Sequence, residues 1–273
     1  MNRKLTTRTL RMIAIQAVLV IIAVTAVGGA VLVHGEFKAT ALKKDNPAGT
    51  SVTGSAETDR DKTTKTTEKL ETSDCEYSYA GFNPKILKDT SDASKILING
   101  SYCLPKGYSP SLAEAVTGSD IMLDSRVAPY YQAMYDAALN DGIKLTPISG
   151  YRSLYQQRKD LEEKIQEYLN ENEDAERKEA TIEAAKDVMI PGSSEHNAGI
   201  AVDICSTAES FENTREFKWL SEHAAEYGFI LRYPKDKTGI TKMNYQPCHF
   251  RYVGIAAAQE MNNKNICLEE YLG

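Results

Sequence analysis

Hydrophobic and polar positions divide this chain of 273 residues into three stretches. Residues 12–33 are apolar apart from Gln16 and Thr25, a run long enough to cross a bilayer as a helix. Residues 35–73 are rich in Thr, Lys, Asp, Ser and Glu, show no helical or strand period, and predict a disordered polar linker. From residue 74 onward, short apolar runs alternate with amphipathic stretches, which indicates a globular domain over 74–273.

The pattern within this domain predicts helices and short strands in irregular alternation. Helices are expected after Asp124–Ser125 (with Val127, Tyr130, Met134 and Ala138 on one face, ending near Gly142), after Ser153, before Pro191 (with Ile182, Ala185 and Met189) and before Gly228 (with Phe217, Leu220, Ala224 and Tyr227). Strands are expected over 143–148, 200–204, 229–233 and 249–253. Because no regular β-α-β rhythm appears, we predict an α+β fold with a small antiparallel sheet flanked by helices.

The apolar run near the N-terminus is flanked asymmetrically by charge. Arg3, Lys4, Arg8 and Arg11 precede it, whereas the first acidic residue is Glu36. By the positive-inside rule, residues 1–34 form a cytoplasmic tail and a single transmembrane anchor, and the rest of the chain lies outside the cell membrane. A cleaved secretory signal is the alternative, although the run is long for a signal peptide and its small residues form a poor cleavage site.

Charge and cysteine content narrow the classes of partner. The net charge of −6 argues against a nucleic-acid partner, because phosphate binding requires a concentrated basic face. Outside the cell cysteines can pair, but an odd number leaves at least one free or bonded elsewhere. The five are Cys75, Cys103, Cys205, Cys248 and Cys267. Their connectivity and the oligomeric state stay open.

Two of the four histidines lie where a metal site is expected. His196 precedes a strand that carries Asp203, and the strand alternation points this carboxylate away from the apolar face formed by its neighbours. His249 begins another strand, and two imidazoles with one carboxylate leave a fourth zinc position open for water. From spacing alone, a His–Asp pair without metal fits as well; His34 and His223 are expected to be structural.

Four segments together resemble the VanY-type D-Ala-D-Ala carboxypeptidases, a zinc family that includes VanX dipeptidases and the hedgehog fold. They are the Ser-x-His-x-x-Gly-x-Ala-x-Asp pattern over 194–203, Ser-Gly-Tyr-Arg-Ser over 149–153 with Gln157, residues 217–220 with 227–229, and residues 249–254. The resemblance spans roughly residues 100–272. It implies zinc ligands at His196, Asp203 and His249.

The same resemblance implies roles for other side chains. Arg152 falls on the substrate-orienting arginine, where a guanidinium can hold a developing oxyanion or a terminal carboxylate. A structural role in the turn is the alternative for this residue. Ser194 and Gln157 fall on positions that line the substrate cleft.

The sequence departs from the family at the catalytic base, a glutamate three residues before the last histidine. Here that position is Gln246, and the family's tryptophan position is Cys248. Glutamine can orient water but cannot accept a proton, and losing a general base costs about 10²–10⁴ in rate. Either another carboxylate such as Glu195 substitutes, or the enzyme is slow, or the domain binds peptide without cutting it. Cys248 could pack in the core, form a disulfide with Cys205 or Cys267, or act as a soft ligand near the metal. Because it is next to His249 on a strand, we expect it to face away from the metal and to pack or form a disulfide.

These features predict a zinc-dependent D,D-carboxypeptidase that removes the terminal D-Ala from peptidoglycan stem peptides. The alternatives are a catalytically weak or inactive protein that binds cell-wall peptide, and an endopeptidase that acts on cross-links. The expected partners are the peptidoglycan peptide and, through the N-terminal helix, the membrane.

Overall fold

The computed structural model describes residues 79–273 of the chain. The predicted anchor, the linker and the first residues of the predicted domain lie outside this range. Among the described helices, none combines the length and the hydropathy needed to span a bilayer.

The described part contains one four-stranded sheet, two small two-stranded sheets and seven α-helices. The strands are β1 Lys85–Ile86, β2 Tyr102–Cys103, β3 Leu112–Glu114, β4 Met122–Asp124, β5 Pro147–Ser149, β6 Ala201–Ile204, β7 Phe229–Tyr233 and β8 Gln246–Tyr252. The α-helices are α2 Ala128–Asn140, α3 Leu154–Glu171, α4 Arg177–Ala184, α5 Arg215–His223, α6 Thr238–Thr241, α7 Ile255–Lys264 and α8 Leu268–Leu272.

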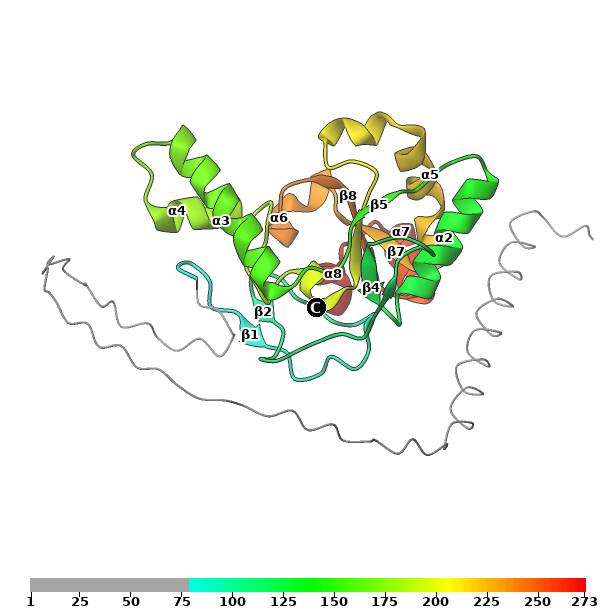
Figure 1. The fold of residues 1–273 in the computed structure, drawn as a ribbon, viewed down its shortest axis with the longest axis horizontal. Helices are drawn as coiled ribbons and strands as arrows, with labels where there is room; N and C mark the ends of the chain where they lie inside the picture. Colours follow the sequence, from blue (N-terminus) through cyan, green and yellow to red (C-terminus); the bar gives the residue numbers. More distant parts are fainter. Residues whose placement is uncertain (1–78) are drawn as a thin grey trace, which may run out of the picture. The chain divides into compact units, whose positions relative to one another are not determined.

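The four-stranded sheet has the order β5-β6-β8-β7, and every neighbouring pair is antiparallel. In Figure 1 the α3–α4 pair lies to one side of this sheet, and α2, α5 and α7 lie to the other. The register places Asp203 on β6 opposite His249 on β8. The mixed fold with a small antiparallel sheet is therefore the architecture that the sequence predicted, and it brings two of the predicted ligands onto neighbouring strands.

Helix α3 follows the sequence prediction closely. Ser153 caps it, since its hydroxyl accepts a hydrogen bond from the backbone N–H of Gln156 at 3.1 Å. Leu161 and Ile165 on its inner face are fully buried, together with side chains from α4 and β7. Each such aliphatic side chain contributes about 1.5–3 kcal/mol of burial free energy.

The prediction for α2 is wrong at its start. Asp124 belongs to β4, and its carboxylate binds the side chain of Arg126 instead of capping a helix. The helix begins one turn later, with Val127 at the N-cap position. Met134 and Ala138 are buried as predicted, but Tyr131, not Tyr130, is the buried tyrosine of this helix.

Two further boundaries differ from prediction. The expected strand over 143–148 is reduced to β5, because Ile143 donates its backbone N–H to Ala138 and so completes the end of α2. The helix expected to run to Pro191 ends at Ala184, and Ile182 is 36 % exposed. Beyond it the carbonyl of Lys186 accepts a bond from the loop before β8, which draws the backbone away from a helical path.

Candidate metal centre

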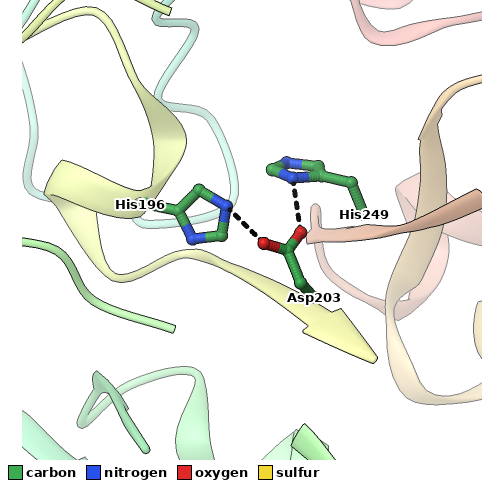
Figure 2. A group of neighbouring side chains, drawn as sticks. All are labelled: His196, Asp203 and His249. Atoms are coloured by element: carbon green, nitrogen blue, oxygen red, sulfur yellow. Dashed lines mark hydrogen bonds and ion pairs between the residues drawn. The ribbon is translucent and has the colours of Figure 1, made fainter. Parts of the chain in front are cut away.

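Three side chains predicted as metal ligands converge in the structure (Figure 2). His196 comes from a short 3₁₀ helix, η1, over Glu195–Ala198, while Asp203 and His249 come from β6 and β8. All three are 4–5 % exposed, and one potential ligand atom from each lies within 4.8 Å of the others. The Asp203 carboxylate lies between the rings: Oδ2 is 3.3 Å from His196 Nε2, and Oδ1 is 3.1 Å from His249 Nδ1.

Two glycines allow the backbone to hold His196 in this position. Gly199 ends η1 in the left-handed region at φ +67°, and a Cβ there would lie 2.8 Å from the backbone nitrogen of Asp124. Gly150 packs so closely on β4 that a Cβ would lie 2.3 Å from the Met122 oxygen. These contacts give a structural reason for both glycines of the recognised motifs.

The ring of His196 is fixed by a backbone carbonyl. Its Nδ1 lies 2.7 Å from the oxygen of Gly150, so Nδ1 carries a proton that it donates. Burial and the charge of Arg152 lower the pKa of His196, which keeps the ring neutral near pH 7. Its Nε2 is then a lone pair facing an ionised carboxylate oxygen of Asp203. A cation between these two facing acceptors would satisfy both of them in this buried site.

The ring of His249 is fixed from the opposite side by Glu195. Its Nε2 lies 3.1 Å from Glu195 Oε2, whereas its Nδ1 faces Asp203. A carboxylate that accepts a hydrogen bond from Nε2–H leaves the lone pair of Nδ1 for the metal. This arrangement is common in carboxylate–histidine–metal sites. The pKa of His249 is raised despite burial, because Asp203 and Glu195 both accept its hydrogen bonds. A metal therefore competes with a proton at Nδ1.

The donor set fits zinc in chemistry and in spacing. Although burial opposes ionisation, the hydrogen bond and charge of His249 hold the pKa of Asp203 well below its usual value, so the carboxylate is charged. Zinc binds nitrogen and oxygen donors at about 2.0–2.2 Å, which places two donors on a tetrahedral ion about 3.3 Å apart. The separations of 3.3 and 3.1 Å between each histidine nitrogen and its facing carboxylate oxygen are near that value, one to Oδ2 and the other to Oδ1 of Asp203.

Arg152 lies at the edge of the ligand set. Its Nη2 donates to Asp203 Oδ2 at 2.9 Å, its Nε donates to Ser149 Oγ at 3.0 Å, and its Nη1 lies 3.7 Å from Asp160. The side chain remains 20 % exposed, in contrast to the buried ligands. It thus presents a positive charge both to the metal ligand and to solvent.

Comparison with known proteins places this geometry in a family. The family model described as VanY, D-alanyl-D-alanine carboxypeptidase, matches residues 120–255. A D-alanyl-D-alanine carboxypeptidase of Enterococcus faecalis is 39% identical over 184 residues, which cover 67% of this chain and 67% of that protein. The chain belongs to the VanY family of D-alanyl-D-alanine carboxypeptidases.

Two solved structures show the same fold. A point mutant of the vancomycin resistance D,D-pentapeptidase VanY, from a VanB-type cassette and in complex with Zn(II), aligns with a TM-score of 0.59 and 38% identity. The alignment covers 67% of this chain and 100% of the VanY mutant chain. VanYB in complex with D-alanine-D-alanine aligns with a TM-score of 0.60 and 39% identity, covering 66% of this chain and 98% of that chain.

Not every position carried over from the VanY family lies open to a substrate. Gln157 is fully buried, and its Nε2 donates to the carbonyl of Met189 at 2.7 Å, so it ties α3 to the segment before Pro191. Ser194, at the N-cap position of η1, is 5 % exposed. Because the Gln157 side chain has no solvent exposure, it does not fit the expected role of lining a substrate cleft.

Gln246, at the VanY-family base position, is half-buried at the start of β8. Its Nε2 donates to the carbonyl of Asp187 at 3.1 Å. Glu195, suggested as a substitute base, is instead engaged by the side chains of two arginines and of His249. Arg232 and Arg251 overcome its burial and keep its pKa far below the usual value, so it is not suited to accept a proton from substrate water.

Cys248 is buried, as one of its predicted alternatives has it, but it forms no disulfide and does not face away from the metal ligands. The register between β7 and β8 shifts between Leu231 and Tyr233, and this irregularity breaks the alternation of side chains before His249. As a result the Cys248 sulfur lies 3.9 Å from Asp203 Oδ1. Burial and this carboxylate raise the pKa of its thiol to about 12. Cys103 is disulfide-bonded, whereas Cys205, Cys248 and Cys267 are free.

Sequence reasoning missed the buried charges behind the site. Arg232 and Arg251 have no solvent exposure, and both donate to Glu195 Oε1, at 2.7 and 2.8 Å. Arg232 stands in a strand of otherwise apolar and aromatic residues, and Arg251 stands between Phe250 and Tyr252; these positions were the available signal. A charge inside an apolar strand is costly unless it has a partner, so its presence predicts one.

Proposed function

We propose that this chain is a zinc D,D-carboxypeptidase that removes the terminal D-Ala from peptidoglycan stem peptides. The observation that carries the proposal is the pair of facing acceptors, His196 Nε2 and Asp203 Oδ2, completed by Nδ1 of His249. Membership of the VanY family supports the same activity. The complex of VanYB with D-alanine-D-alanine supports the substrate class.

His196, Asp203 and His249 would hold the metal, and each is oriented by a further contact. When bound, zinc supplies Lewis-acid chemistry, which polarises a carbonyl and makes water nucleophilic near neutral pH. The carbonyl of Gly150 and the carboxylate of Glu195 keep the two rings in complementary tautomers. Their role is to present both lone pairs without any rearrangement when the metal arrives.

Arg152 is the side chain best placed to bind the substrate. Its guanidinium is anchored on Asp203 and Ser149 yet reaches solvent, so it can donate to an anionic oxygen at the mouth of the site. The terminal carboxylate and the oxyanion of the reacting amide are both such groups. Asp160 beside it limits how far the guanidinium can swing.

Gln246 sets the expected rate. Its amide can orient water through hydrogen bonds, but it cannot take the proton that a glutamate would accept. We therefore expect a slow carboxypeptidase, with kcat about 10²–10⁴ below that of a family member with the glutamate. A wall-peptide-binding protein remains the alternative that this substitution favours.

The proposed location is extracytoplasmic, with the chain held at the cell membrane by residues 1–34. The supporting observations are the apolar run over 12–33 and the basic residues before it. Stem peptides would meet the domain on that side of the membrane.

The test is release of D-Ala by the purified full-length chain with zinc occupancy verified. A pentapeptide ending in D-Ala-D-Ala should lose one D-Ala, chelator should stop the release, and added zinc should restore it. A peptide whose last bond joins an L residue to D-Ala, and a cross-linked muropeptide, test which bond is cleaved. His249→Ala is the matched inactive control. Binding of the pentapeptide without release, at enzyme concentrations equal to substrate, would replace this proposal with the wall-peptide-binding alternative.

A further inference from the structure

The buried charges behind His249 form a continuous chain that ends on the C-terminal helix. Glu195 Oε2 contacts the Nε2 of His249, and Glu195 Oε1 accepts the Nε of Arg232 at 2.7 Å. The other end of the Arg232 guanidinium donates two bonds, at 2.6 and 2.8 Å, to the carboxylate of Glu269 on α8. Only two side chains therefore separate helix α8 from a proposed metal ligand.

The contacts that hold this chain in place are specific. Arg232 has no exposure and Glu269 has 15 %, so the paired bonds between them are largely shielded from water. Asn99 donates to Glu269 Oε1 at 3.2 Å, which fixes the carboxylate from a distant part of the sequence. The Arg232 guanidinium also lies 4.8 Å from the ring of Tyr233, and that ring lies 4.9 Å from the ring of His249.

The charges in this group balance. Glu195 and Glu269 carry two negative charges, and Arg232 and Arg251 carry two positive ones. Removing the charge of Glu269 leaves Arg232 with Glu195 as its sole carboxylate within salt-bridge distance among residues 79–273. Arg232 would then be free to shift toward Glu195 and to change how Glu195 meets His249.

We propose that Glu269 is a positioning residue for the metal centre, acting through Arg232 and Glu195 to hold His249 in the tautomer that presents Nδ1. The proposal relies on the zinc site of the proposed function, but not on peptidase activity. It assigns a role in metal binding to the C-terminal helix α8, which contributes no ligand. A loss of Glu269 weakens zinc binding while leaving the ligands themselves intact.

The test measures the zinc dissociation constant of the full chain by competition with a chromophoric chelator, without substrate. Glu195→Gln, next to the ligand, should raise this constant by about 10- to 100-fold. Glu269→Gln should raise it several-fold, and the double variant should be no weaker than Glu195→Gln alone, because both changes act through one path. Nitrogen NMR of the metal-free chain should show the neutral His249 ring as a mixture of tautomers in both single variants.

The matched control is Glu270→Gln on the same helix. Glu270 accepts the backbone N–H of Cys267 and pairs with Lys237, and glutamine can keep the first of these bonds. The zinc dissociation constant of Glu270→Gln should match that of the unmodified chain. Should Glu269→Gln fail to fold, Glu269→Asp keeps the charge, withdraws it by one methylene and should weaken zinc binding to a smaller degree.

Two results would overturn the proposal: an unchanged zinc constant and His249 spectrum in folded Glu269→Gln, or additive effects of Glu195→Gln and Glu269→Gln. Tight zinc binding without D-Ala release would count against the proposed function alone.

Discussion

Replacing Gln246 by glutamate tests whether the ligand set lacks only a proton acceptor. The amide of Gln246 now donates to the Asp187 carbonyl at 3.1 Å. A glutamate cannot donate that bond, and its oxygen would face the carbonyl oxygen, so the carboxylate is expected to leave it. Losing one neutral hydrogen bond costs about 1 kcal/mol, which lowers Tm by roughly 2–4 °C. The carboxylate is then free to accept a proton at the metal centre.

The expected gain is much larger than this cost. A positioned general base adds about 10²–10⁴ in rate, equivalent to about 3–5 kcal/mol of barrier. We expect Gln246→Glu to raise kcat for D-Ala release within that range with little change in KM. The kcat of Gln246→Glu should fall at low pH, because the new carboxyl group becomes protonated. The pH–rate profile of the unmodified chain should lack this acidic limb.

The assay is D-Ala release from the pentapeptide, with zinc content and Tm measured on each sample. Gln259→Glu on α7 adds the same charge away from the site and should leave kcat unchanged. A rise of less than about threefold in zinc-loaded, folded Gln246→Glu would refute the reasoning, because a base would already be present; general bases give far larger effects.

Four further predictions follow from contacts described above. Gly199→Ala should lower Tm more than Gly192→Ala, because both sit at positive φ but only the Cβ at 199 meets backbone, 2.8 Å from Asp124 N; equal losses in thermal unfolding would contradict this. Arg152→Lys should lower kcat/KM on the order of 10² while zinc stays bound, since lysine lacks the forked donors, and steady-state kinetics checks it. Chelation should lower the free energy of unfolding by about 2.7 kcal/mol relative to zinc at 100 times its Kd, as denaturant titration can measure. Arg232 lowers the pKa of Glu269 despite the burial of this carboxyl group. The ionised carboxylate therefore stabilises the folded state above an unfolded pKa of about 4.3, and this stabilisation is lost as pH falls through the folded pKa. The free energy of unfolding should fall more for the unmodified chain than for Glu269→Gln between pH 5 and 3, roughly the range of this titration.

The sequence was most informative where a local pattern decides the structure. Strand β7 matches its predicted range, and α3 begins directly after Ser153, as predicted. His196, Asp203 and His249 are brought together as the family resemblance implied, and the antiparallel pairing of β6 with β8 places Asp203 opposite His249.

Predictions failed where a distant contact decides the outcome. Asp124 is a residue type that often caps helices, yet it pairs with Leu112 in the β3–β4 ladder and donates its backbone N–H to Gly199. The alternation rule placed Cys248 away from the metal, but a register shift against β7 turns it toward Asp203. The partners of Arg232 lie on η1 and α8, far apart in sequence, so the pattern of a single strand could not reveal them.

The pairing of β6 with β8 has a consequence for how the domain opens. Asp203 and His249 are separated by 46 positions along the chain, and a shared zinc ion would close that segment into a loop. Closing a loop restricts the unfolded chain, so the ion would act as a reversible cross-link between two central strands. Amide protons of both strands should then exchange with deuterated solvent at one common, slowed rate when zinc is present. Without it, the α5–α6 region between the two strands should become the first target of a protease.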